Sequence, residues 1–215
     1  KSSWKYHFSG FVDPQLFYDT RQVVGGRETQ MLLYPAPRDL DAEGQDLNAA
    51  PNLNMLAITT RMSLSIQAPD KVAGFQASGF VEGDFTGSTE AGINMLRLRH
   101  AYLLLDNSAS SFLLGQYWHP LVVPEIMPGT RPLNMGMPFH PYSRYVQARY
   151  QYRTSQQPVR FQVEAVAAFQ LDNASIGPNG KTTSYLRTAS LPEGNLKMKL
   201  CWGEKNPQFI GVMAN

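Results

Sequence analysis

Hydrophobic and polar residues alternate with a period of two along most of the chain. The clearest run covers 56–67, where Leu, Ile and Met occupy most even positions and mainly polar residues occupy the odd ones. Such alternation predicts β-strands, because successive side chains of a strand point to opposite faces. The pattern predicts nine strands, over residues 4–18, 56–67, 75–84, 96–104, 111–118, 146–153, 159–171, 196–202 and 209–215.

The predicted strands are long, and the connections between them alternate in length. A strand that crosses a membrane needs about 9–11 residues, whereas strands of soluble sheets usually have about 5–6. Long connections at 21–53, 86–94, 119–142 and 173–183 alternate with short ones at 69–71, 106–108, 154–158 and 204–207. Outer-membrane barrels have this arrangement, with short turns on one side and long loops on the other. We therefore expect an all-β fold, an antiparallel transmembrane β-barrel.

The composition agrees with a sheet that has one apolar and one polar face. Of the 215 residues 43% are hydrophobic and only 17% are charged, and the mean hydropathy is −0.30. The chain lacks the apolar stretch of about 18 residues that a transmembrane helix needs. The net charge is +2 without a basic run, which argues against a nucleic-acid partner. The single Cys201 excludes an intrachain disulfide. No basic and apolar signal peptide precedes Lys1, so we expect that any signal peptide was removed or was never included in the sequence.

Two other classes of protein compete with the barrel in the membrane. A soluble β-barrel or β-sandwich binding module also alternates, with its apolar face turned toward a core. An outer-membrane barrel enzyme needs a histidine near a serine or an acid, but His7, His100, His119 and His140 are scattered. We therefore expect no catalytic site, metal or cofactor. His100 falls on the apolar row of its strand, which predicts a position at the lipid interface or at a subunit contact.

Two motifs resemble a known family of porins. An R-x-R-x-A strand within Met95–Leu103 is followed by a G-Q strand within Leu114–Trp118. Together they resemble outer-membrane porins of the DcaP-like and phosphate-selective type, and the segments Tyr185–Ala189 and Leu191–Glu193 resemble members from Bacteroidetes. The resemblance implies a 16-stranded barrel in the bacterial outer membrane. It also implies a homotrimer surrounded by outer-membrane lipid, with a channel in each subunit.

The resemblance also implies a role for the connection at 119–143. In such porins the third long loop folds inward and narrows the channel, and this connection has the corresponding position and length. Its prolines make it stiff. The candidates for lining a constriction are Glu125, Arg131 and His140. The alternative is an ordinary surface loop whose charges are solvated.

Nine strands do not complete a porin barrel. Bacterial single-chain barrels have even strand numbers, and an open strand edge in lipid leaves backbone groups without hydrogen bonds. We therefore expect the chain to be the N-terminal portion, about nine strands, of a 16-stranded porin. An eight-stranded barrel with a frayed tail is the alternative.

The polar rows predict which side chains line the channel. If the apolar rows face lipid, the pore-lining residues are Arg61, Arg97, Arg99, Arg149, Arg153, Arg160, Glu82 and Asp84. Arginine binds carboxylates and phosphates through paired hydrogen bonds, and rings of arginine in a pore select anions. The predicted function is passive diffusion of small anionic solutes. The alternative is that the arginines pair with the acids and stiffen the wall.

Overall fold

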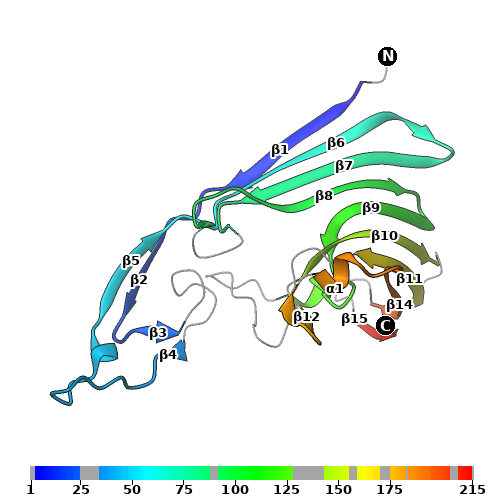
Figure 1. The fold of residues 1–215 in the computed structure, drawn as a ribbon. Helices are drawn as coiled ribbons and strands as arrows, with labels where there is room; N and C mark the ends of the chain where they lie inside the picture. The colour runs from blue at the N-terminus through cyan, green and yellow to red at the C-terminus, as the bar shows by residue number, and fades with distance from the viewer. Residues whose placement is uncertain are drawn as a thin grey trace.

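The computed structural model describes residues 3–24, 34–87, 92–127, 143–154, 159–169, 175–182, 184–203 and 208–214. Its main element is a nine-stranded antiparallel sheet that curls from one edge strand to the other (Figure 1). The strands, in sheet order, are β1 (Lys5–Phe11), β6 (Arg61–Val72), β7 (Phe75–Asp84), β8 (Arg97–Asp106), β9 (Ser110–Trp118), β10 (Arg144–Arg153), β11 (Val159–Phe169), β14 (Glu193–Trp202) and β15 (Gln208–Ala214).

The nine predicted strands are confirmed, and the largest differences concern the first two. The first strand ends at Phe11, and β2 (Gln15–Asp19) pairs instead with β5 (Asn52–Leu56) in a separate two-stranded arm. The turn predicted at 69–71 is wrong, because β6 continues through Val72. The chain reverses at Ala73 and Gly74, which both have positive φ angles.

The long connections contain short strands and short helices. No helix in the described parts of the chain is long and apolar enough to cross a membrane. The short elements are β3 (Val23–Val24), β4 (Tyr34–Pro35), β12 (Ser175–Gly177), β13 (Gly180–Thr182), the 3-10 helices η1 (Leu47–Ala49) and η3 (Pro124–Ile126), and α1 (Ser184–Arg187).

Long and short connections lie at opposite ends of the sheet. Consecutive strands of the sheet are antiparallel neighbours, so every second connection falls at the same end. The connections at one end span residues 12–60, 85–96, 119–143 and 170–192. Those at the other end span 73–74, 107–109, 154–158 and 203–207. The predicted segregation of loops by side is therefore present.

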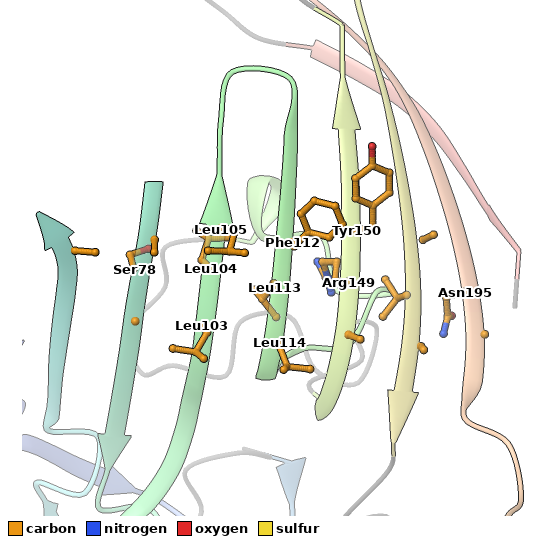
Figure 2. A pocket seen from close by; sticks show the side chains of 18 of the residues that line it. Ser78, Leu103, Leu104, Leu105, Phe112, Leu113, Leu114, Arg149, Tyr150 and Asn195 are labelled. Carbon is orange, nitrogen blue, oxygen red and sulfur yellow. The ribbon is translucent and has the colours of Figure 1, made fainter. Parts of the chain in front are cut away.

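The apolar rows form an exposed outer face. Leu103 on β8 is 64% exposed and Leu114 on β9 is 61% exposed, although both are large and apolar. Figure 2 shows Leu103, Leu105, Phe112, Leu114 and Tyr150 around an apolar hollow on this face. Toward the end with short turns, the rings of Phe112 and Tyr150 lie 4.8 Å apart. An exposed apolar band with aromatic residues toward its edge is what a lipid-facing barrel surface requires.

A β-bulge reverses the alternation in β8. Glu82 lies opposite His100, whereas the next residue, Gly83, lies opposite Leu98, so Arg99 is the extra residue. Beyond the bulge the odd positions of β8 face outward. The period of two over 96–104 predicts that His100, Tyr102 and Leu104 share the apolar, lipid-facing row, and this prediction is wrong. His100 is buried on the inner face, because its directly opposed partner Glu82 is on that face.

Candidate channel wall and lumen segment

Three arginines and two carboxylates form a cluster on the inner face of β6, β7 and β8. Arg97 donates from Nε and Nη2 to the two carboxylate oxygens of Asp84, at 3.0 and 2.7 Å. Arg99 donates from Nε to Glu82 at 2.6 Å and from Nη1 to Asp84 at 2.8 Å. The Nε of Arg61 lies 3.8 Å from Glu82. This arginine cluster (Arg61, Arg97, Arg99, Glu82 and Asp84) carries one more cation than carboxylates.

An aromatic group borders the arginine cluster. The indole of Trp118 contacts two guanidinium groups, with Cζ of Arg144 4.0 Å and Cζ of Arg99 5.9 Å from the ring centroid. The imidazole of His100 lies 5.2 Å from the same indole. Cation–π contacts of this kind stabilise guanidinium groups away from bulk water. Arg144 was not among the residues predicted to line the channel, because it stands at the very start of its strand.

The other predicted arginines follow the same inner row. Arg149 donates to Glu164 at 3.2 Å, to Gln147 and to the carbonyl of Trp118. Arg153 pairs with Asp106 near the short turns. Arg160 is exposed and lines a cavity at that end together with Arg153. All six arginines therefore lie on the inner face, and five of them pair with wall carboxylates.

The segment His119–Met127, here called the lumen segment, lies against the inner face. It leaves β9 at the end with long connections. Gln147, which is completely buried, donates to the carbonyls of Tyr117 and Trp118 just before the segment begins. Val122 is only 2% exposed. This portion of 119–143 folds over the wall rather than away from it.

Three contacts join the lumen segment to β14, which lies 74 to 77 residues further along the chain. His119 Nε2 lies 2.7 Å from Glu193. Lys197 Nζ donates to the carbonyl of Pro120 at 3.2 Å, and Lys199 Nζ donates to Glu125 at 2.6 Å. Neither lysine is among the residues that the sequence pattern predicts to line the channel. The only available sign was the alternation Lys197, Met198, Lys199, Leu200, which places both lysines on one face of a strand.

Of the candidate constriction residues, Glu125 lies on η3 in the lumen segment and half of its side chain is exposed. Burial acts to raise its pKa, but the hydrogen bond from Lys199 and the neighbouring charges outweigh burial, and the pKa is lowered. The carboxylate is therefore ionised and paired. Arg131 and His140 lie outside the described residues. Within the described ranges, no group of three or more His, Cys, Asp or Glu is placed to hold a metal ion.

The exposed apolar belt, the polar inner face and the loops segregated by side define the wall of a transmembrane β-barrel. The fold is that of an outer-membrane β-barrel.

Comparison with solved structures agrees with this class. The chain is similar to the outer membrane channel DcaP of Acinetobacter baumannii, with a TM-score of 0.62, 23% identity and 94% of this chain covered. It spans about half of that protein, which is covered over 49% of its length. A loop-deletion mutant of OmpT, an outer membrane protein of Vibrio cholerae, matches at a TM-score of 0.43 and 10% identity, over 98% of this chain and 68% of that one. No family model and no curated protein matches the sequence.

Proposed function

We propose that the chain forms part of a porin in the bacterial outer membrane, whose water-filled channel passes small anionic solutes by passive diffusion. The observation that carries this proposal is the arginine cluster, where three guanidinium groups face two carboxylates on the inner face. Arg160, exposed at the end with short turns, adds a cation where solutes enter or leave. The wall therefore keeps an excess of positive charge although most of its arginines are paired. Excess positive charge attracts anions into a pore.

Ion pairing and anion attraction act together in this wall. Paired arginines keep their guanidinium groups in fixed positions, and those that stay partly exposed, Arg97 and Arg153, can present N–H groups to a passing carboxylate or phosphate. We propose passive permeation without a chemical step, and without metal or cofactor.

A reversal-potential measurement tests the proposal. The full protein is reconstituted into planar bilayers with a salt gradient, and the sign of the potential gives the preferred ion. We expect an anion preference that weakens in R153Q/R160Q and is unchanged in K181Q, because Lys181 lies on β13 outside the channel wall. Absence of channels would refute the porin, whereas channels that prefer cations would refute only the selectivity.

The resemblance to trimeric porins supports a further proposal, that the protein is a homotrimer. Its test is the mass of the native oligomer in detergent, measured before and after heating. A mass three times that of the unfolded chain supports the trimer, and a monomer contradicts it.

A further inference from the structure

Most of the inward-facing side chains of β14 contact the lumen segment. The inward-facing row consists of Glu193, Asn195, Lys197, Lys199 and Cys201, which alternate with the outward Leu196, Met198 and Leu200. Three of its first four members contact the lumen segment directly. The remaining one of these four, Asn195, donates a hydrogen bond to Glu193 at 2.9 Å and so holds the carboxylate that contacts His119.

The contacts follow the same order along the lumen segment and along β14. His119, Pro120 and Glu125 meet Glu193, Lys197 and Lys199 in turn. At about 3.4 Å per residue, Glu193 and Lys199 are roughly 20 Å apart along the strand. The lumen segment therefore enters from the end with long connections and descends along β14. Glu125 and Ile126 reach the cavity that Asn107 and Ser108, in a short turn, also line.

The two lysines are covered by this contact. Lys197 is 8% exposed and Lys199 is 5% exposed, although each carries an ammonium group. Burying a charge costs free energy unless the charge is paired and hydrogen-bonded. The pairing with Glu125 and with the carbonyl of Pro120 offsets part of this cost, and this part is lost when the lumen segment moves away. Their charges therefore interact more strongly with the lumen segment than with a passing solute.

We infer that Lys197 and Lys199 are positioning residues, which hold the lumen segment against β14 and thereby set the bore of the channel. This inference rests on the proposed channel function. The Lys199–Glu125 pair is its main contact, because it is a charge-assisted hydrogen bond at 2.6 Å at the far end of the described segment. Among the hydrogen bonds of the described residues that join this segment to β14, those that remain without this pair lie nearer the start of the segment, at Lys197 and Glu193.

Two variants separate positioning from a role in lining the pore. K199M removes the ammonium and keeps an apolar stem, and E125Q removes the opposite charge from the partner. If the pair positions the segment, both variants release it, and single-channel conductance rises in both by about two-fold because the bore widens. If the two charges only line an anion channel, K199M lowers anion conductance and E125Q raises it.

The double variant completes the test. In K199M/E125Q we expect the same rise as in either single variant, because a contact is lost only once. The experiment uses the full protein in planar bilayers, with K181Q as a control that loses one exposed lysine elsewhere. Any other combination of signs, or a double variant whose effect is the product of the two single effects, overturns the inference. Failure of the wild-type protein to form channels would refute the porin proposal itself, so the two failures are distinguishable.

Discussion

The guanidinium of Arg99 lies 2.6 Å from the carboxylate of Glu82, and both side chains are largely buried in the wall. The carboxylate of Glu82 also lies 3.8 Å from Nε of Arg61, so it forms ion pairs with two guanidinium groups. Removing one member of a buried ion pair leaves an uncompensated charge, which costs more than the pair itself contributes. The arginine cluster is therefore part of what holds β6, β7 and β8 in register.

The first prediction concerns this carboxylate. In E82Q, Arg99 and Arg61 keep their charges without the partner, and we expect the free energy of unfolding to fall by about 3 kcal/mol. Denaturant unfolding of the full protein in lipid vesicles, followed by tryptophan fluorescence, measures the change. E43Q is the matched control, since Glu43 is exposed on the connection between β4 and η1. Equal stability of E82Q and wild type would show that the cluster does not stabilise the wall.

The second prediction concerns the bulge at Arg99. Spin labels at Leu103→Cys and Leu104→Cys, with Cys201 replaced by Ser, report whether each side chain meets lipid or water. We expect the label at 103 to be accessible to oxygen from the lipid and the label at 104 to a water-soluble nickel chelate. Ser78, the inward partner of Leu104 on β7, provides the reference for the water side. Unbroken alternation from Leu96 onward predicts the reverse, so the reverse result would contradict the bulge.

The sequence was sufficient for the parts of the fold that depend on local alternation. Nine strands and the inner row of six arginines follow from a period of two, because that period reports the local backbone. A bulge is a relation between two strands, so the extra residue at Arg99 left the run Leu96–Leu104 looking continuous. This is why the alternation predicts the wrong face for His100.

The contacts of the lumen segment depend on the path of the chain in space. Lys199 and Glu125 are 74 residues apart, one in a strand and the other in a loop. The residues around each of them therefore do not indicate that the two form a pair. Glu125 is indicated by the sequence, because charged residues in this proline-rich connection are few. Its partner is not indicated, because Lys197 and Lys199 look like the polar row of any strand.

The G-Q motif on β9 has a physical reason that connects it to the bulge. The side chain of Gln116 donates to the carbonyls of Leu98 and Arg99, at 3.0 and 3.1 Å, where the bulge interrupts the ladder. Gly115 has a φ of +135°, and a Cβ there would lie 2.2 Å from the carbonyl oxygen of Ala101. The two residues let β9 approach the bulged strand closely.

The third prediction follows from this close approach. In G115A the new methyl group cannot be accommodated without moving β8 from β9, so we expect a loss of more than about 1 kcal/mol in the free energy of unfolding. G194A is the matched control, because a Cβ at Gly194 on β14 meets nothing within 4 Å. Both variants are compared with wild type by denaturant unfolding in vesicles. A loss in G194A as large as that in G115A would mean that any added methyl group is harmful, and not the contact with Ala101.

The fourth prediction concerns the connection between β1 and β6, outside the wall. Arg21 donates from Nη1 to Asp46 at 2.6 Å, and the backbone N–H groups of Asp39 and Asn48 donate to the same carboxylate. The hydrogen bond from Arg21 is the main reason that the pKa of Asp46 is lowered to about 2.

A carboxyl group with a lowered pKa in the folded state stabilises that state above its unfolded pKa, and the contribution is lost as the pH falls through about 2. In R21Q we expect the pKa of Asp46 to rise toward 3.8, so that the contribution of this carboxyl group to stability becomes smaller. The carboxyl carbon shift of Asp46, followed by NMR in micelles across the acidic range, measures both values, with R38Q as a control for the loss of one arginine. An unchanged titration in R21Q would show that the backbone hydrogen bonds alone hold the carboxylate.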